Sequence, residues 1–176
     1  MINGINPREM ILEILLQIED GEHSHVAIRN ALSKYQFLPK QDRAFITRVC
    51  EGTLEYRIQI DYIINTFSKV SVDKMKPAIR EILRSAVYQL KYMDSVPDSA
   101  VCNEAVKLAQ RKGFYNLKPF VNGVLRTIAR DMDKVSFPKK EEDILKYLSV
   151  KYSMPETLVT RWIEAYGEEV TEKILA

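Results

Sequence analysis

The sequence has few residues of the kinds that build metal sites and reactive centres. It contains two cysteines and two histidines among 176 residues. His23 and His25 are separated by one residue and have no cysteine or ligand-spaced partner, so we expect no metal site. Cys50 and Cys102 each lie in an apolar helical pattern without a nearby histidine that could activate a thiol. We therefore interpret both as buried free thiols of a cytoplasmic protein and expect no catalytic residue in this chain.

Phosphate-binding loops, membrane spans and strands are also missing. The six glycines are scattered, and none forms a Gly-rich phosphate loop. No apolar run approaches the roughly 18 residues of a membrane-spanning helix, so we expect no membrane association. The opening residues, MINGINPREM, contain neither a basic segment nor an apolar run, so we expect no signal peptide. No alternating strand pattern of useful length occurs, which favours an all-helical protein.

Positive charge is concentrated in the middle of the chain. Residues 39–130 contain 16 Lys and Arg against 9 Asp and Glu, whereas residues 1–38 contain 3 against 5 and residues 131–176 contain 7 against 10. The overall formal charge of +2 therefore hides a basic middle between two acidic ends. Such a concentration of charge favours binding to a nucleic-acid backbone. The alternative is a solvated surface that is merely rich in Lys and Arg.

Helical spacing recurs along the whole chain. Asn6 precedes Pro7 and Glu9 in the order typical of a helix start, and Gly113 is a typical helix stop. We divide the chain into a helical bundle in residues 1–132, a polar linker in 133–140 and a small helical unit in 141–176. The last helix has no terminal cap, so we expect a longer protein to continue beyond Ala176. We expect helices over residues 6–20, 24–34, 40–67 with a bend at 52–53, 77–92, 97–113, 116–132, 141–150, 155–166 and 168–176.

Basic residues recur on single faces of two of these helices. The first stripe fits within an arc of about 80° and comprises Lys76, Arg80, Arg84 and Lys91. The second repeats every four residues and comprises Lys118, Asn122, Arg126 and Arg130. The spacing leaves open whether the two stripes adjoin as one patch or form separate solvated faces.

Aromatic and amide side chains add two further expectations. Phe114 and Tyr115 lie in a basic, glycine-containing turn and are candidates for stacking on RNA bases. Asn103, Glu104 and Asn122 interrupt apolar stretches, and we interpret them as a buried hydrogen-bonded group that holds two helices in register. Most other aromatic residues occur at apolar positions and are expected in the core, among them Phe45, Tyr62, Phe67 and Phe120.

Several stretches of the sequence resemble the NusB-like domain at the amino terminus of the Sun/RsmB/Fmu proteins. They are DRAFITRVCEGTLEYRIQIDYII, KMKPAIREILRSAVYQLKYMDSVPDSAVCNEAVKLA and FVNGVLRTIAR, and LSVKYSMPETLVTRWIEAYGEEVTEKIL resembles the connector to their catalytic domain. Those proteins are S-adenosylmethionine-dependent methyltransferases that make 5-methylcytosine in 16S rRNA. The resemblance implies an all-α NusB-like bundle followed by a helical connector, with RNA-binding character.

The same resemblance limits what this fragment is expected to do. The family's methyl-donor pocket and two catalytic cysteines lie in a later domain, and nothing here matches them. We therefore expect no cofactor in this fragment, with S-adenosylmethionine bound by the missing catalytic domain of a methyltransferase parent. The implied partners are rRNA and that C-terminal methyltransferase domain. Two alternatives stay open: a protein-interaction scaffold, or a NusB-type transcription antitermination factor, whose Arg-rich arm would be represented here only by Arg8.

The basic stripes and the resemblance together predict an RNA-binding surface. Phosphate contacts position RNA without specifying its sequence, so we expect modest and salt-sensitive binding. The residues predicted to contact phosphates are Arg80, Arg84, Lys118, Arg126 and Arg130, together with Arg43 and Arg48.

Overall fold

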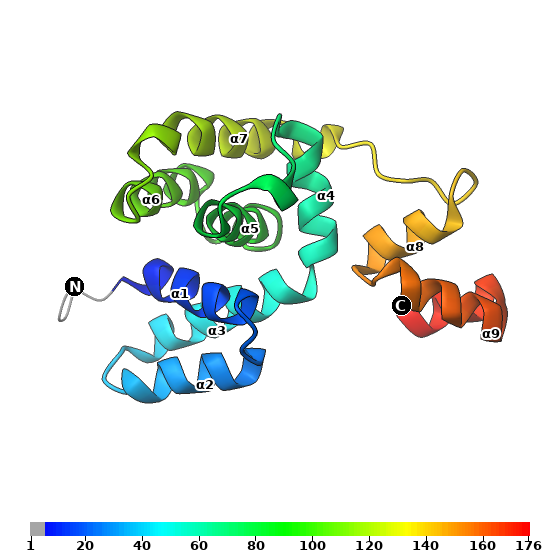
Figure 1. The fold of residues 1–176 in the computed structure, drawn as a ribbon, viewed down its shortest axis with the longest axis horizontal. Coiled ribbons are helices and arrows are strands. Elements are labelled where there is room, and N and C mark those ends of the chain that lie inside the picture. Colours follow the sequence, from blue (N-terminus) through cyan, green and yellow to red (C-terminus); the bar gives the residue numbers. More distant parts are fainter. Residues whose placement is uncertain (1–5) are drawn as a thin grey trace.

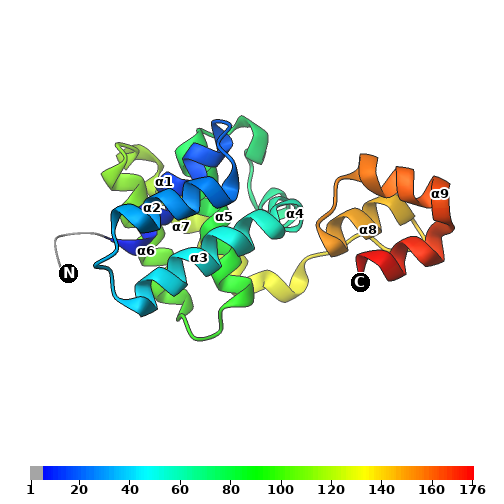
Figure 2. The same cartoon turned by 90° about the horizontal axis from the view of Figure 1, so that it is seen from below.

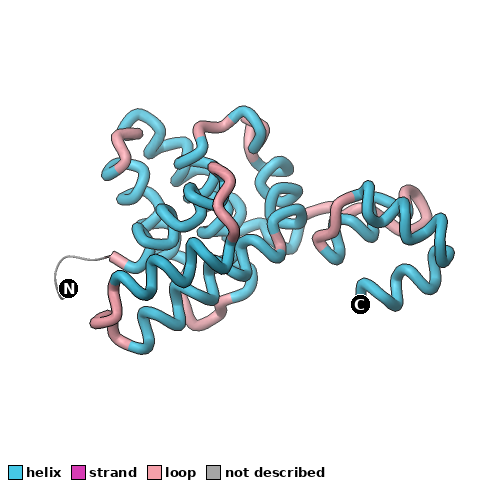
Figure 3. The backbone as a smooth tube through the Cα atoms, turned by 60° about the horizontal axis from the view of Figure 1, so that its bottom comes forward, coloured by secondary structure: helices cyan, strands magenta, loops and turns pink. Residues whose placement is uncertain are grey.

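A computed structural model describes residues 6–176, and these residues form helices and loops without any strand (Figure 3). This confirms the expected all-α fold. The beginning of MINGINPREM, residues 1–5, lies outside the described part. No helix of the described part is long and apolar enough to cross a membrane. In chain order the helices are α1 (Pro7–Glu19), α2 (Ser24–Lys34), α3 (Lys40–Glu55), α4 (Arg57–Phe67), η2 (Val72–Lys74), α5 (Pro77–Tyr92), α6 (Asp98–Arg111), η3 (Tyr115–Leu117), α7 (Lys118–Asp131), η4 (Met132–Lys134), α8 (Ile144–Tyr152) and α9 (Glu156–Leu175).

Helix α5 is the centre of the bundle. It contacts α1, α3, α4, α6 and α7, which surround it in Figure 1. Every residue from 81 to 89 is buried, on all sides of the helix. The sequence predicted a helix with one apolar face and one solvated basic face. The structure corrects this, because neighbouring helices cover both faces.

The break in the long third segment lies at Tyr56 rather than at Gly52. Gly52 is helical and buried, and a Cβ atom at this position would overlap the Tyr88 ring of α5. Tyr56 instead leaves helical geometry (φ −101°, ψ 19°), and its ring stacks 4.5 Å from that of Tyr92. The absence of a side chain at Gly52 therefore allows α3 to approach α5 closely. The bend lies at Tyr56, four residues after Gly52.

Two helix ends predicted from local signals, at Asn6 and at Gly113, are confirmed. The Oδ1 atom of Asn6 accepts hydrogen bonds from the backbone N–H groups of Arg8 (2.9 Å) and Glu9 (3.4 Å). Gly113 follows α6 with φ of +87°, a left-handed conformation that favours glycine. Asparagine and glycine mark these boundaries through local hydrogen bonding and backbone freedom, which do not depend on distant residues.

Helices α8 and α9 pack on each other, and α8 lies beside α4, on one side of the bundle (Figures 1 and 2). Gly167, at φ 82° and ψ 168°, interrupts α9 between the two helical pieces expected there. The connecting segment is fastened to α4, because the Tyr62 hydroxyl donates to the Ser136 carbonyl (2.6 Å) and the Tyr62 ring stacks 5.8 Å from that of Phe137. The C-terminal helices are thus joined to the bundle by side-chain contacts as well as by the chain.

Candidate nucleic-acid interface

The outer face of α7 carries the polar stripe predicted from the sequence. Its opposite face is buried in the bundle through Val121, Val124, Leu125 and Ile128. Because one side of the helix faces the core, residues spaced by four on the other side face solvent. Asn122, Arg126 and Arg130 are exposed and Lys118 is partly exposed. This stripe is therefore accessible along the length of the helix.

Two cations of this stripe have neutral partners. The Lys118 ammonium donates to Gln110 Oε1 (2.8 Å) and lies 4.7 Å from the centre of the Tyr115 ring. The Arg126 guanidinium donates to Asn103 Oδ1 (2.8 Å) and to Asn122 Oδ1 (3.2 Å). Since amide oxygens orient a cation without cancelling its charge, both side chains present a full positive charge at the surface.

Arg130 differs because it has an acidic partner. Its side chain is 70% exposed and lies 3.0 Å from Asp131, which also contacts Lys134 at 3.3 Å. The hydrogen bond from Arg130 lowers the pKa of Asp131 below its ordinary value, so this carboxylate stays ionised at neutral pH. Arg130 and Lys134 thus share the carboxylate of Asp131, and the Arg130 side chain stays largely exposed.

The amides near α7 are not buried, contrary to the prediction. Asn103 and Asn122 are exposed, and Glu104 is partly buried beside Lys107 (3.4 Å). The two asparagines do not bond to each other, but both accept hydrogen bonds from Arg126. Arg126 therefore connects the surfaces of α6 and α7. The interpretation as a buried register-setting pair is wrong, because these helix positions point to solvent while their apolar neighbours face the core.

The turn before α7 exposes one of its two aromatic residues. Tyr115 is 64% exposed, whereas Phe114 packs against the core. Of the adjacent cations, Lys112 contacts Glu13 (2.9 Å) and Glu9 (3.3 Å) on α1. Tyr115 and the neighbouring Lys118 thus form an exposed aromatic and basic pair at the start of α7, which is the combination that stacks on unpaired bases.

Arg84 occupies a different environment from the one expected of a phosphate ligand. Its side chain is 9% exposed and donates to both oxygens of Asp61 at 2.8 Å. The remaining guanidinium nitrogen donates to Glu81 at 3.2 Å. Burial raises the pKa of Glu81, and the adjacent guanidinium opposes this shift. Arg84 is therefore committed to a buried ion cluster between α4 and α5.

Arg80 is also occupied within the fold. Its side chain is 15% exposed, forms an ion pair with Glu19 of α1, and donates to the carbonyls of Val72 (3.2 Å) and Met75 (3.3 Å). With Arg80 and Arg84 both covered, the expected stripe on α5 is not a continuous surface. Arg80 and Arg84 consequently do not join the α7 stripe in one exposed patch.

The two arginines of α3 bind backbone carbonyls. Arg43 donates to Leu32 (2.8 Å) and Tyr35 (3.1 Å) at the end of α2, and Arg48 donates to Tyr92 (3.0 Å) at the end of α5. Carbonyls at a helix C-terminus lack intrahelical donors, so a guanidinium from a neighbouring helix can satisfy them. Arg43 and Arg48 therefore have structural partners in this fold.

The two thiols are buried and free, as predicted. Burial raises the pKa of Cys50 to about 12 and raises that of Cys102. A thiol with a raised pKa supplies little thiolate at neutral pH, which is the opposite of an activated nucleophile. Within residues 6–176, no group of three or more His, Cys, Asp and Glu side chains could hold a metal ion.

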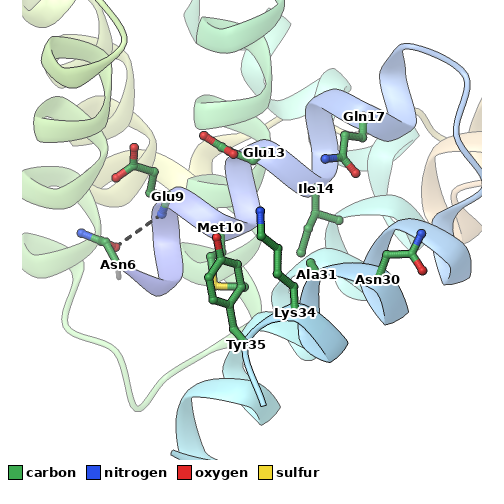
Figure 4. Close-up of a pocket in the computed structure, with 10 residues that line it drawn as sticks. All are labelled: Asn6, Glu9, Met10, Glu13, Ile14, Gln17, Asn30, Ala31, Lys34 and Tyr35. Atoms are coloured by element: carbon green, nitrogen blue, oxygen red, sulfur yellow. Dashed lines mark hydrogen bonds between the residues drawn. The ribbon is translucent and has the colours of Figure 1, made fainter. Parts of the chain in front are cut away.

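The sequence did not indicate one further feature, a groove of about 360 Å³ between α1 and α2 (Figure 4). Polar side chains at spacing four on α1, ending at Gln17, form one wall, and Asn30 and Lys34 of α2 line the other. This spacing is visible in the sequence but is also that of any solvated helix face. Only the packing of α1 on α2 brings the two sets together.

Comparison with known proteins places the described geometry in a family. The profile of the NusB family matches residues 5–130. The "Probable ribosomal RNA small subunit methyltransferase B" of Bacillus subtilis (strain 168) is 35% identical over 169 residues, which are 95% of this chain and 37% of that protein. The chain thus spans less than two fifths of the length of this relative.

A shorter relative and a solved structure match the bundle. The "Transcription antitermination protein NusB" of Dictyoglomus thermophilum is 34% identical over 134 residues, which are 76% of this chain and 88% of that protein. The structure titled "Crystal Structure of Antitermination Factors NusB and NusE in complex with dsRNA" superposes with a TM-score of 0.65 at 22% identity, covering 70% of this chain and 93% of that chain. This structural likeness establishes the fold.

Proposed function

This chain belongs to the NusB family, and we propose that it is an RNA-binding domain that docks ribosomal RNA for a methyltransferase domain of the same, longer protein. The name of the Bacillus subtilis relative supports the choice of ribosomal RNA as substrate. Since this chain corresponds to 37% of that relative, the chemistry is assigned to the remaining part of the protein. Docking by one domain raises the local concentration of RNA at the other.

The exposed cations of α7 carry the proposal. Lys118 and Arg126 are held by amide oxygens, so their charge is available to phosphate oxygens, and Arg130 shares its carboxylate with Lys134. Tyr115 adds an exposed ring beside Lys118. Arg80 and Arg84 are largely covered and paired with acidic side chains, so they are left out of the proposed surface. Arg43 and Arg48 donate to neutral backbone carbonyls, and their contact with RNA stays a prediction.

The residues present do not fit S-adenosylmethionine. The described part of the chain contains no strand and therefore no strand end with the glycine loop on which such nucleotide-like cofactors bind. The two cysteines are buried with raised pKa values. We propose that the donor pocket and the nucleophile belong to the part of the parent protein outside this chain.

The salt dependence of RNA binding tests the proposal. Each neutralised phosphate of a single strand contributes a slope of about −0.7 to log K against log salt, so three contacts give about −2. Arg126→Ala should weaken binding to every rRNA fragment and make the slope shallower by about 0.7. Arg161→Ala, which removes an exposed cation from α9, is the matched control and should behave as the parent.

Three results of this experiment have distinct meanings. Loss of affinity with a shallower slope, in a variant that circular dichroism reports as folded, supports the α7 surface. RNA binding that Arg126→Ala leaves unchanged at every salt concentration would move the interface elsewhere on the chain. Absence of RNA binding by the parent would overturn the RNA-docking function and favour the protein-interaction scaffold.

A further inference from the structure

We propose that the groove between α1 and α2 is a binding site for one unpaired base of a single-stranded RNA. This inference rests on the proposed RNA-binding function and adds a second contact, separate from the α7 surface. The groove has a volume of about 360 Å³, within the range of about 300–1,000 Å³ that is usual for small-molecule sites. In Figure 4, Gln17 and Asn30 lie at one end and Asn6 and Tyr35 lie toward the other.

The lining has an apolar floor and an amide rim. Met10 and Ile14 are 8% and 1% exposed and form the floor with Ala31, which suits the flat face of a base. Gln17 and Asn30 are exposed at the rim, and within residues 6–176 neither side-chain amide has a hydrogen-bond partner. An amide offers both donors and an acceptor, as the edge of a base requires. Unpaired bases are read in this way in RNA.

The surroundings of the groove suit the rest of the nucleotide. Lys34 lines the groove from α2, and Tyr35 follows it at the helix end. Phe37, two residues further on, is 51% exposed and lies edge-on to Tyr35. The exposed Lys34 provides positive charge for the adjoining phosphates. An aromatic and basic turn beside an amide-rimmed groove is the combination that binds single-stranded RNA.

The charge of the α1 wall favours a base over a basic peptide. Glu9 and Glu13 line the groove, but both already contact Lys112, at 3.3 Å and 2.9 Å, and Arg111 lies 3.7 Å from Glu9. Lys112 and Arg111 already offset part of the negative charge of these carboxylates, so a cationic peptide would gain less from them than from unpaired carboxylates. A neutral base can donate N–H groups to the carboxylates while the ion pairs remain.

Filling the groove with a larger side chain tests its assignment as a binding site for an unpaired base. Ala31→Phe places a ring on the floor, and Ser33→Phe adds the same ring at an exposed position of α2 outside the groove. We expect Ala31→Phe to bind single-stranded RNA about tenfold more weakly, as for the loss of one stacked base, with an unchanged salt slope. Ser33→Phe should bind as the parent. Equal affinities of the two folded variants would overturn the proposal.

The unsubstituted chain provides a second test that does not depend on the folding of a variant. The side-chain amide resonances of Gln17 and Asn30 are followed by NMR during titration with an RNA tetranucleotide, with nucleoside monophosphates or with a tetra-arginine peptide. Shifts on adding the tetranucleotide that exceed those with the monophosphates support the assignment. Shifts only with monophosphates would indicate a site for free nucleotides, and shifts only with the peptide would indicate a peptide-binding groove. Either result would overturn the assignment of the groove to an unpaired base of RNA.

The experiments distinguish an incorrect assignment of the groove from an incorrect proposal of RNA docking. If only the groove assignment fails, the parent still binds RNA with the salt dependence expected of the α7 surface, and the Gln17 and Asn30 resonances stay unchanged. If the RNA-docking function fails, the parent does not bind RNA at any salt concentration, and the groove proposal falls with it.

Discussion

Ser153 and Gln59 satisfy the open ends of each other's helices. The Ser153 hydroxyl accepts hydrogen bonds from the backbone N–H groups of Ile58 (3.1 Å) and Gln59 (3.4 Å) in the first turn of α4. In return, the Gln59 side chain donates to the carbonyls of Val150 and Lys151, both at 3.3 Å, in the last turn of α8. The first turn of a helix has free N–H groups and the last has free carbonyls. The two ends therefore cap each other across the boundary between the bundle and the C-terminal helices.

Removing the Ser153 hydroxyl should loosen this boundary. Ser153→Ala leaves two N–H groups of α4 without an acceptor, and the loss of an N-capping side chain costs about 1 kcal/mol. We expect the free energy of unfolding in urea to fall by that amount and limited proteolysis to cleave the 135–140 segment faster. Ser136→Ala, an exposed position in that segment, is the control. Equal stability of the two variants would mean that the cap contributes nothing.

Two helical glycines should respond in opposite directions to the same substitution. Gly52→Ala places a Cβ against the Tyr88 ring, which is itself 6% exposed and packed beside Tyr56 and Tyr92. Overpacking of this kind costs about 1–3 kcal/mol. Gly123→Ala on α7 meets open space and should gain about 0.5–1 kcal/mol from helix propensity. Thermal unfolding of both variants provides the comparison, and a stabilising Gly52→Ala would contradict the packing described.

Arg84 and Arg126 have similar positions in the sequence pattern, but they should have different roles. Substitution of Arg84 should lower the stability of the fold, and substitution of Arg126 should lower the affinity for RNA. Arg84→Ala leaves Asp61 and Glu81 partly buried without their cation, and breaking such a pair costs about 3–5 kcal/mol. Arg126→Ala removes an exposed side chain, so its effect on stability should stay within about 0.5 kcal/mol. Urea denaturation of both variants measures the change in the free energy of unfolding, and RNA titration measures the change in affinity. An Arg84→Ala variant as stable as the parent would refute the role of the buried cluster.

The two thiols should react only when the chain unfolds. The pKa of Cys50 rises from 9.0 to about 12 on burial, which lowers its thiolate fraction about a thousandfold at neutral pH. That of Cys102 is also raised. Ellman's reagent at pH 8 should therefore label the folded chain very slowly and should titrate two thiols in denaturant. Rapid labelling of one thiol in the folded chain would show that its site opens readily.

Local signals were sufficient for much of the fold. Asn6 and Gly113 lie at helix boundaries where the sequence placed them, because a side-chain cap and a left-handed residue act within one turn. The spacing of apolar residues likewise predicted the buried face of α7. Gly52 shows the limit of this reasoning. A glycine can permit a bend or a close approach, and the position of Tyr88 decides between them.

By itself, the sequence determined the all-helical architecture, the segments that form helices and the family resemblance, because these follow from periodicity, capping residues and motif order. Only the tertiary structure decided which basic residues are accessible. Arg84 and Arg126 each lie in a stripe of similar spacing, but α5 is surrounded by other helices whereas α7 has a face in solvent. The accessibility of a side chain depends on what packs against its helix from elsewhere in the chain, and helical spacing contains no information about those neighbours.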